Sequence, residues 1–391
     1  MPTEPLNAAH AERAFHEAQA RVRAGDAAGA LRALDAAAGA GHAPALLQRG
    51  IWRLIGLAGP VDLPAALADV QAAAERAHAP ALTLQAQLVA AGAAGQARDF
   101  AAVRERLLQA AQAGEPRAAV QLAVLIPATP AHAALRAALL RAAAATGEPV
   151  ARALFERLPP APPGPPLAWP ALRGAVQEAV AWPHERPLPP AELRHAQPRI
   201  QALPGLLSAD ECLYVVLKGL PLLRPARVVG RDGRAAVDPM RSNDTAKFGL
   251  LEADAVLQSL DLRVCAALGQ PASHGEGLAL LRYQPGQQYL PHCDWIDPAR
   301  EATQADLLRW GQRIATAVVY LNDGFEGGHT AFPELGLAFR GNVGDAFTWD
   351  NVRPDGTVEP RSLHAGRPPL SGVKFLLSKW MRDRDQAFHD T

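Results

Sequence analysis

Apolar and polar residues follow different patterns in the two halves of the chain. Residues 8–158 are rich in Ala, Leu and Arg and contain few residues that favour strands, so intrinsic propensities predict helices. Similar segments recur there at intervals of about three dozen residues: GHAPALLQRG at Gly41, AHAPALTLQA at Ala77, GEPRAAVQLA at Gly114 and GEPVARALFE at Gly147. A period of this length is typical of helix-turn-helix solenoids, which predicts an α-helical repeat domain over 1–158.

A small residue occupies the same place in each repeated segment. These residues are Ala45, Ala81, Ala118 and Ala151. Small side chains would let paired helices approach closely, and stacked helix pairs leave a concave surface on which a protein or peptide can dock. A purely structural or dimerising role for the repeats stays open. The segments resemble tetratricopeptide repeats, although they lack the aromatic positions of that class.

A proline-rich stretch separates the two halves of the chain. PPAPPGPP at 159–166 breaks both helix and strand and should be extended in the polyproline form. Prolines continue to interrupt the sequence up to residue 202, with one short helix expected at 172–180. We therefore predict a connecting segment over 159–202, followed by a second domain at 203–391.

The second half alternates short runs of strand-forming residues with turns. The expected strands lie at 278–282, 288–294, 314–321, 337–340, 346–349 and 373–381. Gly, Pro and Asn separate these runs, which is typical of a β-sandwich or β-barrel. Helices expected at 209–219 and 253–268 would support one sheet. The predicted fold class is therefore α+β with more than one domain.

The segment LRYQPGQQYLPHCD at 281–294 contains the main candidate for chemistry. Residues two apart in a strand share a face, so His292 and Asp294 should point the same way, with Cys293 opposite. One imidazole and one carboxylate supply two ligands for a divalent metal. A third ligand from elsewhere would complete a 2-His-1-carboxylate facial triad.

Two other His and carboxylate pairs have the same two-residue spacing. His274 and Glu276 lie in a Gly-rich stretch where a turn is expected rather than a strand. His10 and Glu12 lie in a predicted helix, where residues two apart diverge. Neither pair displaces His292 as the predicted ligand.

The downstream segment RSLHAGRPPLSGVKFLLSKWMR supplies a candidate third ligand, His364. A turn containing Pro368, Pro369 and Gly372 follows, and Lys374 lies on the next expected strand. The pattern predicts that the two segments form a hairpin. Lys374 could then bind the far carboxylate of a dicarboxylate that chelates the metal.

These motifs resemble the iron(II)- and 2-oxoglutarate-dependent dioxygenases, and within them the prolyl 4-hydroxylase branch. The resemblance covers roughly 203–382 and rests on linked motifs in the family's order: LLSADECLYVV, RYQPGQQYLPHCD, ATAVVYLNDGFEGGHTAFPELGLAFRGNVGDAFTWDN and HAGRPPLSGVKFLLSKWMR. It implies that the second domain is a double-stranded β-helix of the jelly-roll type with buttressing helices.

The resemblance also implies roles for single residues. His292, Asp294 and His364 would hold Fe(II), which 2-oxoglutarate chelates and to which O2 is supplied. Lys374 would bind the remote carboxylate of 2-oxoglutarate through a charge-assisted hydrogen bond. Supporting roles at the co-substrate or peptide pocket fall to Tyr283, Thr330 and Trp380. For Tyr283 and Trp380 a place in the apolar core stays an equal alternative.

The implied reaction is hydroxylation of an unactivated C–H, with ascorbate as the expected reductant of oxidised iron. The resemblance and the repeats favour a prolyl residue in a protein or peptide as the substrate. The alternatives are a free amino acid or another small metabolite, or a helical-repeat scaffold whose jelly-roll is inactive. The intact set of expected ligands argues against the inactive scaffold.

Some positions depart from the family pattern or lie outside it. His329 stands where the family usually carries an acidic residue, and a tolerated surface substitution is the simpler interpretation. Arg241 and Ser242 resemble the segment that borders the substrate groove, but Asn243 alters that pattern. The charged stretch 297–311 is either a lid or rim over the site or an inert surface excursion.

Composition excludes several other classes of protein. The 391 residues carry a formal net charge of zero and are 49% apolar, which allows large cores but gives no basic patch for nucleic acid and no membrane span. Three scattered cysteines are too few for a disulfide framework, so reduced thiols are expected. The N-terminus lacks the features of a secretion signal, which favours a cytoplasmic protein.

Overall fold

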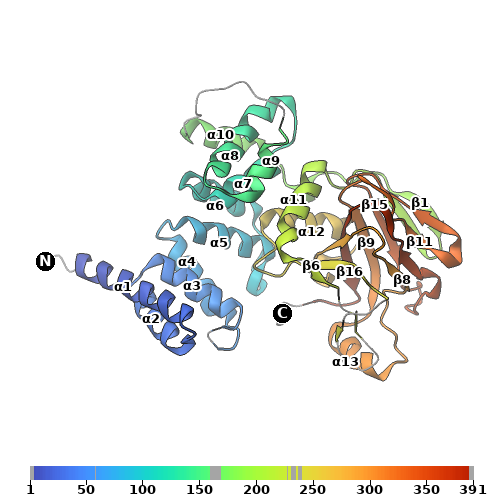
Figure 1. Cartoon of the computed structure of the whole chain (residues 1–391), viewed down its shortest axis with the longest axis horizontal. Helices are drawn as coiled ribbons and strands as arrows, with labels where there is room; N and C mark the ends of the chain where they lie inside the picture. The colour runs from blue at the N-terminus through green and yellow to red at the C-terminus, as the bar shows by residue number, and fades with distance from the viewer. Residues whose placement is uncertain are drawn as a thin grey trace. The chain divides into compact units, whose positions relative to one another are not determined.

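The computed structural model describes residues 4–57, 59–158, 169–226, 228–229, 235–236 and 240–386 (Figure 1). The chain forms two compact units that divide between Val180 and Ala181. The proline-rich stretch 159–166 lies outside the described residues. Among the described residues, none of the helices combines the length and the apolar character that a bilayer crossing requires.

The N-terminal unit is helical, as predicted. Its helices are α1 (Glu4–Arg23), α2 (Ala27–Gly39), α3 (Ala43–Leu54), α4 (Leu63–Ala74), α5 (Ala79–Ala91), α6 (Phe100–Gln112), α7 (Pro116–Leu125), α8 (Ala133–Ala145), α9 (Pro149–Phe155) and α10 (Trp169–Ala179). From α1 to α9 each helix packs against the next along the chain, and α10 packs on α6 and α8.

The repeated segments coincide with the starts of α3, α5, α7 and α9. Each of these helices has a proline in its first turn, where the missing N–H costs nothing and the fixed φ suits a helix. The small residues that the sequence singles out are fully buried: Ala45, Ala81, Ala118 and Ala151. Close approach of neighbouring helices at these positions is therefore confirmed.

The C-terminal unit contains two main antiparallel sheets. The eight-stranded sheet has the order β1 (Glu192–Ala196), β2 (Arg199–Leu203), β13 (Ala346–Asp350), β9 (Arg313–Tyr320), β16 (Lys374–Arg382), β7 (Ala279–Tyr283), β6 (Asp244–Lys247) and β3 (Arg224–Pro225). The four-stranded sheet has the order β12 (Leu337–Phe339), β11 (Thr330–Phe332), β14 (His364–Gly366) and β8 (Tyr289–His292).

Two short pairs complete the strands. They are β10 (Phe325–Gly327) with β15 (Pro369–Gly372), and β4 (Val228–Val229) with β5 (Ala235–Ala236). Aromatic and aliphatic side chains from both large sheets form one core, including Tyr320, Trp349 and Leu376 from the larger sheet and Phe332 from the smaller. Two sheets packed face to face on such a core are the jelly-roll arrangement that the sequence predicts.

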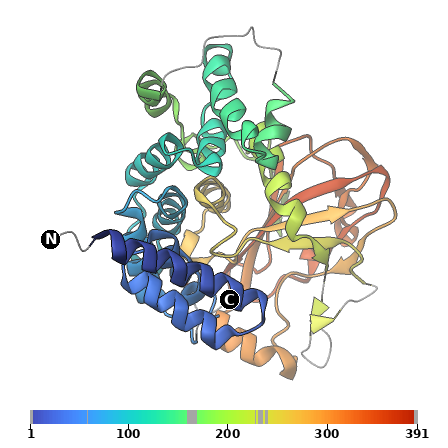
Figure 2. The ribbon, with the colours of Figure 1, turned by 60° about the vertical axis from the view of Figure 1, so that its left-hand side comes forward.

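Helices α11 (Ala209–Gly219) and α12 (Ala255–Leu268) match the two predicted buttressing helices. Helix α11 contacts β7, and α12 contacts β9 and β16. Figure 2 shows both helices beside the strands of the larger sheet. One more helix, α13 (Glu301–Trp310), lies within the charged stretch 297–311.

The predicted hairpin between His364 and Lys374 is wrong. Strand β14, which begins at His364, pairs with β8 and β11 in the smaller sheet. Strand β16, which begins at Lys374, pairs with β7 and β9 in the larger sheet. The prolines do not close a turn between paired strands, because Pro369 begins β15, which pairs with β10 and carries the chain from one sheet to the other.

The segment 159–202 contributes to both units. Its helix α10 belongs to the helical unit, while β1 and most of β2 lie at the edge of the larger sheet. Sequence reasoning missed these two strands, because only part of β2 alternates between buried and exposed residues and β1 is largely exposed.

Candidate metal and co-substrate site

Three predicted ligands converge at one place between the two sheets. His292 ends β8, His364 begins β14, and the two residues are paired in the strand register. Asp294 follows β8 by two residues. Ligand atoms of the three side chains all lie within 4.8 Å of one another. Nε2 of His292 is 3.8 Å from Asp294 Oδ1, and Nε2 of His364 is 3.5 Å from Asp294 Oδ2.

Backbone carbonyls orient both imidazoles. Nδ1 of His292 lies 2.8 Å from the carbonyl oxygen of Leu290, and Nδ1 of His364 lies 2.9 Å from that of Ser362. A carbonyl only accepts, so each Nδ1 carries the proton and each Nε2 presents its lone pair towards Asp294. Burial and the neighbouring His364 lower the pKa of His292 to about 3, which keeps its ring neutral at pH 7.

The carboxylate of Asp294 is almost completely buried. Burial alone would raise its pKa, but His364, His292 and Arg313 together hold the pKa below its usual value. The hydroxyl of Thr316 donates a hydrogen bond of 2.8 Å to Oδ2. Asp294 is therefore an anion at neutral pH, stabilised by the positive charge of Arg313 and by the Thr316 hydroxyl.

This donor set fits a divalent transition metal. Two imidazole nitrogens and one carboxylate on one side of an ion are the ligands of non-haem Fe(II) sites, which leave the other positions open. Both imidazoles have the second hydrogen bond that metal-bound histidines almost always have. Within the part of the chain that the structure describes, this is the only group of three such side chains close enough to share an ion.

Lys374 is a buried cation without an anionic partner. Its side chain is fully buried, and its ammonium donates to the carbonyl of Gly328 at 2.9 Å. Nζ also lies 4.4 Å from the centre of the Tyr283 ring. Among the described residues no carboxylate forms an ion pair with it, and burial lowers its pKa to about 7. A buried ammonium of this kind is electrostatically complementary to an anion.

Of the other residues predicted at the co-substrate pocket, Tyr283 contacts Lys374, and Thr330 lies two residues after Gly328, which binds Lys374. Tyr283 pairs with Lys374 across β7 and β16, and a β-carbon at Gly366 would lie 3.2 Å from its hydroxyl. Its ring therefore extends from the lysine to the strand that carries His364. Thr330 is buried two residues after Gly328, whose carbonyl binds Lys374.

Tyr320 is a member of this site that sequence reasoning missed. Its hydroxyl lies 3.0 Å from Thr330 Oγ1, accepts the N–H of Thr330 and donates to the carbonyl of Phe339. The centre of its ring is 6.0 Å from Lys374 Nζ. A signal was available, because Thr316, Val318 and Tyr320 share one face of β9 and that face is buried.

Trp380 lies in the core, on the strand face that it shares with Lys374. It pairs with Thr316 across β16 and β9, and the guanidinium of Arg313 stacks 4.6 Å from the centre of its ring. Its buried Nε1 has no hydrogen-bond partner among the described residues. Trp380 is thus a core aromatic that also carries an unused donor.

A second missed residue, Tyr289, covers one side of His292. The two rings are stacked, with centres 3.4 Å apart and planes 13° apart. The guanidinium of Arg241 lies 4.8 Å from the centre of the Tyr289 ring, and its Nε donates to Asn243 Oδ1 at 3.0 Å. The altered residue Asn243 therefore positions Arg241 beside the metal ligands.

The two rival pairs are engaged elsewhere. The carboxylate of Glu276 binds Arg313 and Arg382, and Glu12 binds His16 and His42 instead of His10. His329 separates Gly328 from Thr330, and burial, followed by Arg340 and Arg367, lowers its pKa.

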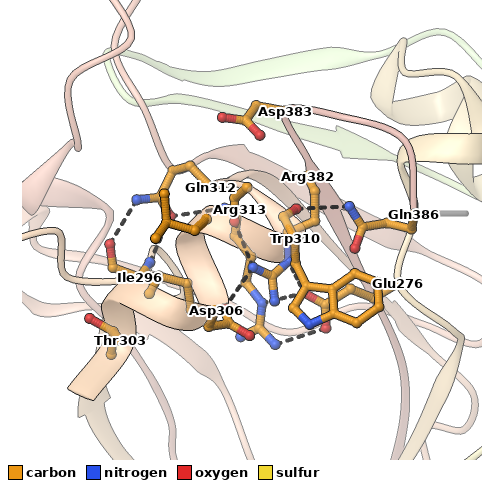
Figure 3. Close-up of polar contacts among 12 residues, drawn as sticks. Glu276, Ile296, Thr303, Asp306, Trp310, Gln312, Arg313, Arg382, Asp383 and Gln386 are labelled. Atoms are coloured by element: carbon orange, nitrogen blue, oxygen red, sulfur yellow. Dashed lines mark hydrogen bonds and ion pairs between the residues drawn. The ribbon is translucent and has the colours of Figure 1, made fainter. Parts of the chain in front are cut away.

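The stretch 297–311 is joined to the larger sheet through a charge cluster (Figure 3). Glu276 accepts hydrogen bonds from Arg313 and Arg382 at 2.6 Å each, and Arg382 also donates to Asp306 on α13 at 2.9 Å. Burial raises the pKa of Glu276, but the two arginines outweigh this effect and hold the pKa at about 2. Arg313 connects the cluster to Trp380.

The base of the stretch 297–311 is closed by one side chain. The amide of Gln312 accepts from the N–H of Ile296 and donates to its carbonyl, both at 2.7 Å (Figure 3). None of the residues in α13 is buried, and Leu308 is 78% exposed. Polar contacts rather than an apolar face therefore hold α13 in place.

The fold and the site define a non-haem iron oxygenase, and a family model agrees. The 2OG-Fe(II) oxygenase superfamily model matches residues 278–382. Probable prolyl 4-hydroxylase 3 of Arabidopsis thaliana is 31% identical over 204 residues, covering 47% of this chain and 69% of the relative. Prolyl 4-hydroxylase 1 of the same plant is 33% identical over 202 residues, covering 48% and 70%. The chain therefore belongs to the prolyl 4-hydroxylase-like 2OG-Fe(II) oxygenases.

Solved structures of similar chains each match slightly less than half of this chain. The viral collagen prolyl hydroxylase vCPH of Paramecium bursaria Chlorella virus-1 is 24% identical and matches 46% of this chain and 94% of its own, with a TM-score of 0.36. A prolyl-4-hydroxylase of Pseudomonas putida is 20% identical and matches 47% and 92%, with a TM-score of 0.33.

Proposed function

We propose that this chain hydroxylates a prolyl residue of a protein or peptide. In the balanced reaction, 2-oxoglutarate, O2 and one C–H bond give succinate, carbon dioxide and one C–OH group. The observation that carries the proposal is the pairing of a His-Asp-His trio with Lys374, a fully buried ammonium that has no anionic partner among the described residues. Fe(II) bound to these three side chains would supply the chemistry that oxidises the co-substrate and the C–H bond.

Different side chains of the C-terminal unit would bind the metal and the co-substrate. His292, Asp294 and His364 would hold the metal through Nε2, a carboxylate oxygen and Nε2. Lys374 would bind the remote carboxylate of 2-oxoglutarate, with the Tyr283 ring beside its ammonium and Thr330 near the carbonyl of Gly328. Binding gives Lys374 the anion that it lacks, so co-substrate and site are electrostatically complementary.

Three features support a prolyl substrate. The relatives at 31% and 33% identity are named as prolyl 4-hydroxylases. Tyr289, stacked on His292 and covered by the guanidinium of Arg241, offers an aromatic surface beside a metal ligand, which suits a proline ring. The helical unit, with its helices packed in sequence, is proposed to form a solenoid of repeats that docks the polypeptide.

We further propose that α13 forms a rim of the substrate entrance rather than an inert excursion. It is linked to the larger sheet through Asp306 and the backbone at its C-terminal end, both of which bind Arg382, and from there through Glu276 to Arg313, which stacks on Trp380. Ascorbate is proposed as the reductant that restores oxidised iron, which predicts more turnovers per enzyme when it is present.

The test uses the full chain loaded with Fe(II) and 2-oxoglutarate under anaerobic conditions. On admission of O2, a proline-containing peptide library should give succinate and a gain of one oxygen atom in stoichiometric amounts. The same assay with free proline and other amino acids tests the alternative of a small substrate. Asp294→Ala serves as the control that keeps the co-substrate lysine but loses a metal ligand. Equal succinate formation by this variant would refute the assignment.

A further inference from the structure

Behind the metal carboxylate lies a chain of two buried polar side chains that the ligand set does not explain. Oδ2 of Asp294 accepts a hydrogen bond of 2.8 Å from Thr316 Oγ1 on β9. The same Thr316 oxygen accepts a hydrogen bond of 2.8 Å from Nδ2 of Asn351, just after β13. Asn351 is 0% exposed and Thr316 is 1% exposed. The chain therefore runs from one strand of the larger sheet to its neighbour, away from solvent.

The chemistry of the three groups sets the direction of both hydrogen bonds. An ionised carboxylate only accepts, so the Thr316 hydrogen points to Asp294. The hydroxyl then has only lone pairs left for Asn351, and the amide must present its NH2 group. With the amide reversed, two acceptors would compete for one hydroxyl hydrogen. Asn351 therefore holds the Thr316 hydroxyl in the one orientation that donates to Asp294.

The cost of keeping Asn351 indicates that its role is not structural. Its Oδ1 is buried and has no hydrogen-bond partner among the described residues. A buried acceptor without a partner destabilises the fold, and an aliphatic side chain of similar size would avoid that loss. The backbone of Asn351 is separately paired with Ile314 and Glu359, so its side chain is not needed to hold the strand.

We infer that Thr316 and Asn351 are positioning residues that make Asp294 a ligand through one oxygen. This inference rests on the proposed metal site. Both carboxylate oxygens face an imidazole, with Oδ2 3.5 Å from His364 Nε2 and Oδ1 3.8 Å from His292 Nε2. The Thr316 hydrogen bond takes one lone pair of Oδ2, which makes Oδ1 the better metal ligand of the two oxygens. A carboxylate that used both oxygens would take one of the three positions that a facial triad leaves open for 2-oxoglutarate and O2.

The same argument explains why the residue is Thr rather than Val on a buried strand. Thr316 shares its face of β9 with Val318 and Tyr320, inside the core between the sheets. A valine would fill the same volume there without a polar group, as β-branched residues do in sheet interiors. The hydroxyl is thus needed for its hydrogen bond and not for packing.

The experiment measures metal affinity of the full chain, using Mn(II) followed by electron paramagnetic resonance and Co(II) followed by visible absorption. The variants are Thr316→Val, Thr316→Ser, Asn351→Leu and the double variant Thr316→Val/Asn351→Leu. Loss of an outer hydrogen bond to a ligand typically weakens metal binding about 10–100-fold. We expect losses in that range for Thr316→Val, smaller losses for Asn351→Leu, and affinity close to wild type for Thr316→Ser.

The double variant separates a relay from independent packing effects. Since Asn351 acts only through the Thr316 hydroxyl, adding Asn351→Leu to Thr316→Val should cause no further loss of affinity. The thermal midpoint of metal-free Asn351→Leu should equal or exceed that of wild type, because the orphaned amide oxygen is removed. The Co(II) spectrum of Thr316→Val should differ from wild type, since both carboxylate oxygens become free to bind.

Specific outcomes would overturn the inference. Wild-type affinity in Thr316→Val, or losses that add in the double variant, would show that the pair does not position Asp294. A fall in the metal-free midpoint of Asn351→Leu would assign the amide a structural role instead. If the wild-type chain binds neither metal, the proposed function and this inference fail together, whereas a defect confined to the variants leaves both standing.

Discussion

Replacing Lys374 by methionine tests the central electrostatic feature of the site. Methionine keeps the length and apolar stem of lysine but removes the charge, so packing is preserved while the anion-binding group is lost. Among the described residues, the contacts of the ammonium are the carbonyl of Gly328 and the faces of Tyr283 and Tyr320. The variant should therefore lose 2-oxoglutarate binding and yet be more stable than wild type at mildly acidic pH.

The magnitude follows from the pKa of Lys374, which burial lowers from 10.5 to about 7. One pKa unit corresponds to about 1.4 kcal/mol, so the charged form costs on the order of 5 kcal/mol more in the fold than in the unfolded chain. That penalty is fully present below pH 7, shrinks as pH rises, and is absent above about pH 10.5. The Gly328 carbonyl left unpaired offsets about 1–3 kcal/mol, which leaves a gain of about 2–4 kcal/mol at pH 6.

The assay is denaturant unfolding of metal-free wild type and Lys374→Met at several values between pH 6 and pH 10, with and without 2-oxoglutarate. The stability advantage of the variant should be largest at pH 6 and disappear toward pH 10, and the co-substrate should stabilise only the wild type. Lys379→Met is the matched control on the same strand, because Lys379 is also buried but pairs with Asp261 at 2.6 Å. Removing it should destabilise by up to about 3–5 kcal/mol.

A variant less stable than wild type at pH 6 would refute the reasoning about Lys374. A stability difference that stays constant with pH would do the same, since it would show that the lysine does not titrate with a lowered pKa. A Lys379→Met control that behaves like Lys374→Met would show that the method reports loss of lysine in general. Retained 2-oxoglutarate binding in Lys374→Met would remove the lysine from the co-substrate site.

Other predictions address the metal, the co-substrate and the charge cluster. Asp294→Ala should abolish succinate formation, measured by mass spectrometry, while leaving far-UV circular dichroism unchanged. The affinity of wild type for 2-oxoglutarate should not change with pH below pH 7. Above pH 7 it should fall up to about tenfold per pH unit, because binding then requires the uptake of a proton by Lys374. Titration calorimetry in two buffers should detect that proton. Glu276→Gln should lower the free energy of unfolding by about 3 kcal/mol at pH 7 and by little near pH 2, since Glu276 has a pKa of about 2; an equal loss at both pH values would contradict this.

The metal ligands were predictable because their geometry is local. His292 and Asp294 are two residues apart at the end of one strand, and the period of a strand places such residues on one face. Lys374 and His364 were predicted from the resemblance to the family, in which these two residues have a fixed spacing along the chain. The structure brings all three ligands together and buries Lys374, which has no carboxylate partner among the described residues.

The supporting residues were not predictable in the same way, because they depend on contacts between distant strands. Thr316 and Asp294 are 22 positions apart in the sequence, and Asn351 and Thr316 are 35 positions apart. Nothing in a run of strand-forming residues indicates which neighbouring strand it will face. The pattern does show that Thr316 and Tyr320 lie on a buried face, which is a weak signal that each polar group has a partner.

The mistaken hairpin shows that the sequence pattern of a strand does not reveal which of two sheets the strand joins. Alternation tells which residues share a face of a strand, but a strand can be paired within either sheet of a sandwich. Here β14 joins the smaller sheet and β16 the larger one, so His364 and Lys374 project into the core from different layers. A hairpin would have placed both residues in one sheet as near neighbours. The crossing through β15 instead places His364 and Lys374 in separate sheets, from which the proposed co-substrate would be held at both of its ends.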